Sequence, residues 1–223
     1  MAERRITNIV IDFGGVIAPA SMEQVKSRFR EIGVKNIEEY LDVITQRGFI
    51  GDFESGTIGT EGFISKISEI AGQEVTHERC AYACQGFFLP IPQRNLDILT
   101  RLRSEGYALS LLSNTNPLVA EWTLSDSFDG KGHPLSHYFD RIYLSYAIKA
   151  MKPDPKAFMN MLEGEGVEPE RILFIDDGER NIEAASKLGI NTLKVTNGED
   201  WTVLVEPRLK ELNGCGDQEG TGR

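Results

Sequence analysis

The sequence lacks several features that mark secreted, membrane and zinc-binding proteins. It contains only three cysteines in 223 residues, Cys80, Cys84 and Cys215, and no CxxC spacing. This odd number argues against a disulfide framework and against a structural zinc site, so we expect buried or incidental thiols. No apolar run approaches the roughly 20 residues that span a bilayer, and we therefore expect no membrane segment.

Positive charge is also scarce. The chain has 24 Lys and Arg residues against 34 Asp and Glu residues, which gives a net charge of −10 at pH 7. An acidic chain without a basic stripe repels a phosphate backbone, which argues against nucleic-acid binding. Arg4 and Arg5 precede an apolar stretch as in a signal peptide, but Asp12 interrupts that stretch and no convincing cleavage site follows. We therefore expect a cytoplasmic protein.

The sequence does contain an alternation of strand-like and helix-like segments. Its 40 % hydrophobic and 26 % charged residues are typical of a globular chain. Strand-like runs cover residues 6–11, 107–112, 141–145, 171–175 and 191–195. Helical patterns cover residues 95–105, 118–124, 154–162, 179–188 and 201–212. This alternation predicts βαβ units, and therefore an α/β fold with a Rossmann-like parallel sheet covered on both faces.

Residues 21–90 break the alternation, because they carry helical patterns and almost no strand signal. Ser21 and Gln24 have the spacing of a capping box at the start of a first helix. Asn36 can cap a second helix that reaches Ile44. Caps of two further helices are expected at Thr60 and Thr76.

We interpret this helical block as a cap domain inserted into the first crossover of the sheet. The predicted Rossmann-like catalytic core comprises residues 1–19 and 91–212, and the predicted helical cap comprises residues 20–90. The glycine-rich residues 213–223 are predicted to form a disordered tail.

Polar side chains stand at the ends of four predicted strands. In an open parallel sheet, ligands bind at the carboxyl ends of the strands, so these side chains are expected to share one site. Each of them alone also fits a turn or a helix cap, but that explanation would have to hold four times independently. In chain order the residues are Asp12, the pair Ser113 and Asn114, Lys152, and the pair Asp176 and Asp177.

The residue types at the carboxyl ends of the predicted strands suit phosphate chemistry. Three neighbouring carboxylates repel one another and favour a cation, and a site of oxygen ligands beside a phosphate suits Mg²⁺. Lys152 and Ser113 would bind phosphate oxygens, together with backbone amides of the turn at residues 13–15. Asp12 would attack phosphorus and form an aspartyl-phosphate.

The same segments resemble the four motifs of the haloacid dehalogenase-like (HAD) hydrolase superfamily, over residues 6 to about 197. The insert resembles the small helical cap of that superfamily. Its segment at residues 53–58 is similar to one in the sugar-1-phosphate phosphatase-like branch. The motifs read Asp12-Phe13-Gly14-Gly15-Val16, Ser113-Asn114, Lys152-Pro153 and Asp176-Asp177.

The resemblance implies a role for each motif residue. Asp12 would be the nucleophile and a ligand of Mg²⁺. Phosphate would be held by Ser113, Asn114 and Lys152. The remaining metal ligands would be the Gly14 carbonyl, Asp176 and Asp177.

One position departs from the pattern of most phosphatases in this superfamily. They carry a second Asp two residues after the nucleophile, as general acid and base, and this chain has Gly14 there. A positioned general acid contributes roughly 10²–10⁴-fold to the rate. The substrate would therefore have a good leaving group, such as an anomeric sugar hydroxyl, or its proton would come from water or from a cap residue. Glu54 is a candidate cap residue, and the alternative for Glu54 is a solvated loop carboxylate.

Two other interpretations stay open. A dehalogenase expels halide without a general acid and without Mg²⁺, but the acidic pair at residues 176–177 would then lack a compensating cation. A non-catalytic binding protein could retain the fold, although Asp12 and Lys152 are both present. The prediction is therefore a Mg²⁺-dependent phosphatase of a small phosphorylated metabolite, for which a sugar phosphate is the best candidate.

Overall fold

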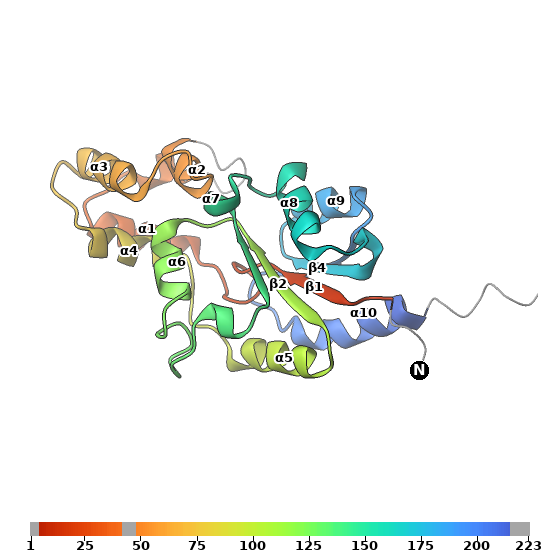
Figure 1. Ribbon diagram of the computed structural model, residues 1–223. Helices are drawn as coiled ribbons and strands as arrows, with labels where there is room; N and C mark the ends of the chain where they lie inside the picture. The colour runs from red at the N-terminus through yellow and green to blue at the C-terminus, as the bar shows by residue number, and fades with distance from the viewer. Residues whose placement is uncertain (1–4, 42–47, 215–223) are drawn as a thin grey trace, which may run out of the picture.

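The computed structural model describes residues 5–41 and 48–214 of the protein. Its core is a parallel sheet of five strands: β1 (Asn8–Ile11), β2 (Ala108–Ser113), β3 (Arg141–Leu144), β4 (Ile172–Asp176) and β5 (Asn191–Lys194). The strand order is β3-β2-β1-β4-β5, and each neighbouring pair is parallel (Figure 1). The predicted α/β class is thereby confirmed, and each strand begins and ends within two residues of its predicted range.

Helices cover both faces of this sheet. One face carries α5 (Gln93–Ser104) and α10 (Thr202–Gly214), and the other carries α8 (Pro155–Glu165) and α9 (Glu179–Lys187). Side chains alternate along a strand, so Ile9 and Ile11 of β1 pack toward the first face and Val10 packs toward the second. Burial on both faces explains why the central strands are continuous apolar runs in the sequence. Shorter segments connect these elements: α6 (Pro117–Thr123), η2 (Leu135–His137), α7 (Ser145–Ile148) and η3 (Pro169–Arg171).

The insert between β1 and β2 is helical, as predicted. Its described elements are α1 (Met22–Glu31), η1 (Ile37–Glu39), α2 (Gly48–Glu54), α3 (Thr60–Ala71) and α4 (His77–Gln85). Phe53 stacks on Phe63 with 4.1 Å between the ring centroids, and this pair lies in an apolar cluster that also includes Leu118 and Val119 of α6. The insert therefore packs directly against a helix of the core (Figure 1). The exact domain boundaries at residues 20 and 90 stay a prediction.

Local signals predicted the ends of some insert helices and not others. The Ser21 hydroxyl accepts a hydrogen bond from the amide of Gln24 at 3.2 Å, which confirms the predicted cap of α1. The helix predicted from Asn36 is wrong for the described residues, because only the single turn η1 forms and Asn36 makes no side-chain cap. Ile44, its predicted end, lies outside the described residues.

Two further helix starts differ from the sequence analysis. Gly59 is the N-cap of α3, and Thr60 is its first residue rather than its cap. Helix α2 was not predicted, because its segment contains Gly48 and Gly51, and glycine disfavours a helix interior by about 1 kcal/mol. Packing of Phe53 in the insert core stabilises α2 despite this composition.

Cys80 and Cys84 are buried free thiols on α4, as predicted, and Cys215 lies outside the described residues. Helix α10 continues through Asn213, whose side-chain oxygen accepts a hydrogen bond from the amide of Ile6 at 2.9 Å. Residues 213 and 214, which were predicted as part of the tail, therefore belong to α10, and residues 215–223 lie outside the described residues. None of the described helices is both long enough and apolar enough to cross a bilayer.

A buried carboxylate fastens α8 to the sheet. The Glu165 side chain accepts hydrogen bonds from Asn8 of β1 at 2.6 Å, from Ser110 of β2 at 2.6 Å and from the Tyr143 hydroxyl of β3 at 2.9 Å. The Arg141 guanidinium lies 3.8 Å from the same carboxylate. A buried charge is tolerated when it is paired and hydrogen-bonded in this way. Glu165 thus fixes α8 against the strands whose carboxyl ends carry the predicted site.

We expect Glu165→Ala to lower the free energy of unfolding by about 3 kcal/mol, because two buried donors and the half-buried Tyr143 hydroxyl lose their acceptor. Urea denaturation followed by circular dichroism measures this change. The matched control is Glu163→Ala, an exposed position on the same helix, which should change stability by less than about 0.5 kcal/mol. Equal losses in the two variants would contradict the structural role of Glu165.

Candidate active site

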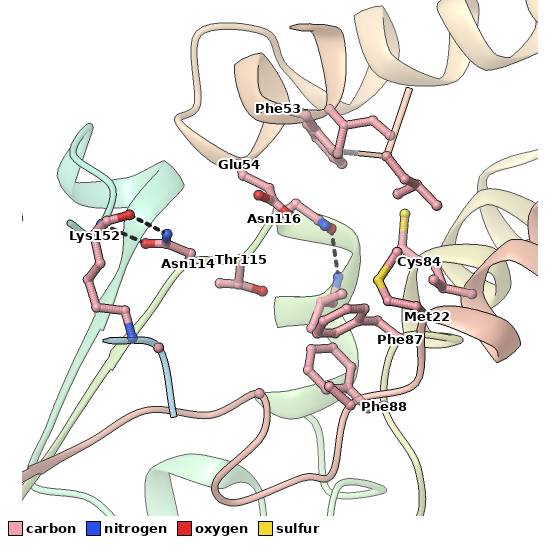
Figure 2. Close-up of a pocket in the computed structure, with 18 of the residues that line it drawn as sticks. Met22, Phe53, Glu54, Cys84, Phe87, Phe88, Asn114, Thr115, Asn116 and Lys152 are labelled. Carbon is pink, nitrogen blue, oxygen red and sulfur yellow. Dashed lines mark hydrogen bonds between the residues drawn. The ribbon is translucent and has the colours of Figure 1, made fainter. Parts of the chain in front are cut away.

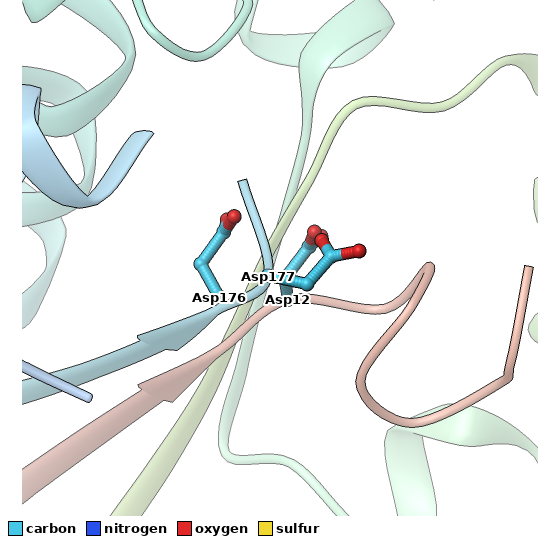
Figure 3. A group of neighbouring side chains, drawn as sticks. All are labelled: Asp12, Asp176 and Asp177. Atoms are coloured by element: carbon cyan, nitrogen blue, oxygen red, sulfur yellow. The ribbon is translucent and has the colours of Figure 1, made fainter. Parts of the chain in front are cut away.

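Three carboxylates meet at the carboxyl edge of the sheet. Asp12 directly follows β1, Asp176 ends β4, and Asp177 comes next in the chain. One oxygen of each of these side chains lies within 4.8 Å of the others, and Figure 3 shows the three pointing away from the same end of the two strands. Parallel pairing of β1 with β4 produces this meeting, because it places the strand ends side by side. The predicted acidic site is thereby confirmed.

Lys152 lies between two of these carboxylates. Its ammonium is 2.8 Å from Oδ1 of Asp12 and 2.7 Å from Oδ2 of Asp176, and the side chain is only 1 % exposed. Burial by itself lowers the pKa of Lys152, but the adjacent Asp12 and Asp176 carboxylates outweigh this and raise it. The lysine is therefore a fixed positive charge at neutral pH.

The backbone around Lys152 is held by Asn114. The Asn114 side chain accepts from the Lys152 amide and donates to the Lys152 carbonyl, both at 2.8 Å (Figure 2). This pair of bonds joins the segment after β2 to the loop before α8. The side chain of Asn114 thus positions the lysine, and its predicted contact with phosphate stays a prediction.

The donor set of this site fits Mg²⁺. Burial raises the pKa of Asp12 to about 8, the Lys152 ammonium opposes the rise, and repulsion from Asp176 and Asp177 adds to it. Burial and the charge of Asp176 also raise the pKa of Asp177. The carboxylate charges therefore exceed what one lysine compensates, and a hard divalent cation bound by oxygen ligands would balance them. Asp12, Asp176 and Asp177 are the residues that would hold it.

Gly14 and Gly15, which closely follow Asp12, have different surroundings. Gly15 has a φ of +80°, and a Cβ at this position would lie 2.1 Å from Oδ2 of Asp177. A Cβ at Gly14 would instead lie 3.3 Å from the Phe87 ring and 3.4 Å from the Phe88 ring. Gly15 therefore makes room for an acidic side chain of the site, whereas Gly14 faces two aromatic rings. Metal binding by the Gly14 carbonyl stays a prediction.

A cavity of about 440 Å³ opens above the acidic cluster, between the core and the insert. The core contributes polar residues to its wall, among them Asp12, Lys152 and Asp177. The described part of the insert contributes mostly apolar side chains together with the carboxylate of Glu54 (Figure 2). The volume of the cavity lies within the range of roughly 300–1,000 Å³ that is typical of small-molecule binding sites. The apolar lining from the insert includes Met22, Phe29, Ile50, Phe53 and Phe63.

The structure brings most of the predicted site residues to the wall of this cavity, and the exceptions are Asp176, which is fully buried, and Ser113. Ser113 is 3 % exposed, its hydroxyl donates to the carbonyl of Asn114 at 3.4 Å, and it is not part of the cavity wall. Its role in phosphate binding therefore stays a prediction. Sequence reasoning missed Asn181, which donates from its side chain to both oxygens of Asp176 at 3.0 and 3.2 Å. The position of Asn181 in the first helical turn after Asp176 and Asp177 was the feature of the sequence that could have indicated this contact.

Comparison with known proteins agrees with this geometry. A family described as haloacid dehalogenase-like hydrolase matches residues 6–189. The match covers most of the chain, including four of the five strands and the insert, so the protein belongs to the haloacid dehalogenase-like hydrolases.

Similar proteins come from Bacteroides and Porphyromonas. D-Ribitol-5-phosphate phosphatase of Bacteroides thetaiotaomicron is 38 % identical over 196 residues, which are 88 % of this chain and 95 % of that protein. A crystal structure of a HAD family enzyme from the same species, in complex with magnesium and inorganic phosphate, has a TM-score of 0.82 and 37 % identity. It covers 89 % of this chain and 98 % of that one. A protein of Porphyromonas gingivalis described as a predicted HAD-like family hydrolase has a TM-score of 0.87 and 38 % identity, covering 92 % and 98 %.

We expect Gly15→Ala to weaken Mg²⁺ binding by about 10- to 100-fold, because the added methyl displaces the Asp177 carboxylate. The positive φ should also reduce stability by roughly 1–2 kcal/mol. The rise of the melting temperature with Mg²⁺ concentration measures both quantities, since a ligand of the folded state stabilises it by mass action.

The matched control is Gly72→Ala. Gly72 has a φ of +65° at the end of α3, and nothing lies within 4 Å of a Cβ there. It should lose stability by a similar amount and bind Mg²⁺ as the wild-type protein does. Unchanged Mg²⁺ affinity in Gly15→Ala would show that Asp177 is not a ligand.

Proposed function

We propose that this protein is a Mg²⁺-dependent phosphatase that hydrolyses a small sugar or polyol phosphate through an aspartyl-phosphate on Asp12. The observation that carries the proposal is the arrangement at the edge of the sheet. A lysine ammonium lies 2.8 Å from the Asp12 carboxylate, and two further carboxylates lie beside them. This arrangement combines a nucleophile, a fixed cation for phosphate oxygens and a metal site within one cavity.

Each residue has a defined task in this reaction. Asp12 attacks the phosphorus atom, and Lys152 compensates the negative charge of the nucleophile and the phosphate. Asp176 and Asp177 would hold the metal together with Asp12. The bound Mg²⁺ would neutralise charge on the phosphate oxygens. The two hydrogen bonds between the Asn114 side chain and the Lys152 backbone keep the ammonium in place as the substrate enters.

The substrate class follows from the cavity and from the relatives. A volume of about 440 Å³ suits a metabolite of a few carbon atoms beside its phosphate. The 38 % identical relative is named for D-ribitol 5-phosphate, an ester of a primary alcohol, and supports a polyol phosphate here. The sugar-1-phosphate branch suggested by the segment at residues 53–58 stays a prediction. The two ester types differ in leaving group and are therefore distinguishable in an assay.

The other interpretations have less support. A dehalogenase would leave three clustered carboxylates with only Lys152 as counter-charge. A non-catalytic binding protein would not need a nucleophile held 2.8 Å from a buried lysine. Cytoplasmic location and the absence of nucleic-acid partners stay predictions.

We expect phosphate release from a polyol 5-phosphate to require Mg²⁺ and to fall by at least roughly 10³-fold in Asp12→Asn, because the nucleophile is lost. Initial rates of phosphate release measure this. Parallel assays with a sugar 1-phosphate, an aryl phosphate and a 2-haloacid distinguish the substrate classes.

Asp126→Asn is the control, because Asp126 is exposed and lies outside the cavity wall. It should retain the wild-type rate. Halide release without Mg²⁺, in place of phosphate release, would identify a dehalogenase. No turnover of any of the four compounds, with ligand binding retained, would favour a binding protein.

A further inference from the structure

Position 14, in the turn that follows the nucleophile, carries no side chain and is crowded by two aromatic rings. The Phe87 and Phe88 rings already lie at van der Waals distance from a Cβ at Gly14. These rings are fixed by edge-to-face contacts, with centroids 5.2 Å apart for Phe87 and Phe88 and 4.9 Å apart for Phe13 and Phe88. A carboxylic acid that protonates the leaving group must therefore come from another wall of the cavity.

Among the described residues of the insert, Glu54 is the carboxylate that lines this cavity. It is the last residue of α2, and it lines the same cavity as Asp12 and Lys152. In Figure 2 it lies on the insert side of the pocket, near Phe53 and Asn116, while Lys152 reaches the pocket from the core side. A phosphate bound at Asp12 would thus have its ester oxygen directed away from the core, toward the wall that contains Glu54.

The backbone of Glu54 is tied directly to the core. The buried Ser145 hydroxyl, at the start of α7, donates to the Glu54 carbonyl at 2.6 Å and accepts from the Thr115 amide at 2.9 Å. Thr115 is itself part of the cavity wall, one residue after Asn114. The segment after α2 is also joined to the residue that follows α7, because the Lys149 ammonium donates a hydrogen bond to the Gly56 carbonyl at 2.5 Å. These contacts place Glu54 relative to the nucleophile although the two belong to different parts of the chain.

We propose that Glu54 is the proton donor to the leaving group, and that Ser145 is the positioning residue that holds it at the cavity. The proposal rests on the proposed phosphatase function. As the Asp12 oxygen bonds to phosphorus, the P–O bond to the leaving group breaks, and that oxygen takes the Glu54 proton to give the free alcohol. A water then attacks phosphorus and transfers a proton to the Glu54 carboxylate. The bond to Asp12 breaks, inorganic phosphate leaves, and Glu54 is again protonated.

The surroundings of Glu54 support the protonated starting form. Burial raises the pKa of Glu54 to about 7, so a large part of it is neutral near physiological pH. Cys84 on α4 lies close enough for its thiol to interact with Glu54. The hydroxyl of Tyr146 belongs to α7, which packs against α2, and the ammonium of Lys149 belongs to the residue directly after α7. Other ionisable groups on the described cavity wall are Tyr40 from the insert and Asp12, Lys152, Asp177, Glu179 and Arg180 from the core.

The test compares leaving groups in Glu54→Gln, which keeps the shape of the side chain and removes its acidity. An alkoxide leaving group needs the proton of Glu54, whereas an aryl oxide leaves without protonation. We expect kcat/KM for a polyol 5-phosphate to fall by about 10²- to 10⁴-fold, and kcat/KM for 4-nitrophenyl phosphate to fall by less than about tenfold. For wild-type protein, kcat/KM for the polyol ester should decline above about pH 7 as Glu54 loses its proton, and Glu54→Gln should lack this decline.

Asp52→Asn is the matched control, because Asp52 is an exposed carboxylate on the same helix. It should behave as wild type with both esters. Ser145→Ala keeps the Glu54 carboxyl group and removes the hydroxyl that holds the Glu54 backbone. This variant should therefore show the same preference for the aryl ester, but to a smaller degree. Equal losses on both esters in Glu54→Gln, or no loss on either, would overturn the role of Glu54. Failure of the proposed function is a separate outcome, since wild-type protein would then release phosphate from neither ester.

Discussion

The contact of one lysine with two carboxylates is the interaction on which the site depends. Asp12, Asp176 and Asp177 lie within 4.8 Å of one another, where burial strengthens their mutual repulsion. Lys152 offsets part of this repulsion through ion pairs of 2.7 and 2.8 Å. The neighbouring structure maintains this geometry: Asn114 fixes the lysine backbone, and Glu165 holds α8 against the strands.

The excess of negative charge has a functional consequence. A cluster that a single lysine does not neutralise is suited to bind a divalent cation, and the cation with the lysine then makes the cavity attractive to phosphate. This local balance operates in a chain whose net charge is −10, because close and buried charges outweigh distant, screened ones. The same balance agrees with membership of the haloacid dehalogenase-like hydrolases and with relatives crystallised with magnesium and phosphate.

The insert completes the site from the opposite side. It supplies the apolar wall of the cavity and the carboxylate of Glu54, and it is joined to the core at Ser145 and through the packing of α4 on α6. The rings of Phe87 and Phe88 close the space beside Gly14. Nucleophile and proposed proton donor thus come from different parts of the chain, and their relative position depends on how the insert packs on the core.

The sequence by itself determined the α/β class, the five strands, the helical insert and the acidic residues, because the strands are apolar runs that end at Asp12, Ser113 and Asp176. It did not predict α2, whose glycines give a weak local signal, and it predicted a longer helix after Asn36 than the described turn. Only the tertiary structure decided that Ser113 lies off the cavity wall and that Glu54 lies on it. The physical reason is that strand pairing follows from local pattern, whereas the packing of an insert depends on contacts between residues far apart in the chain.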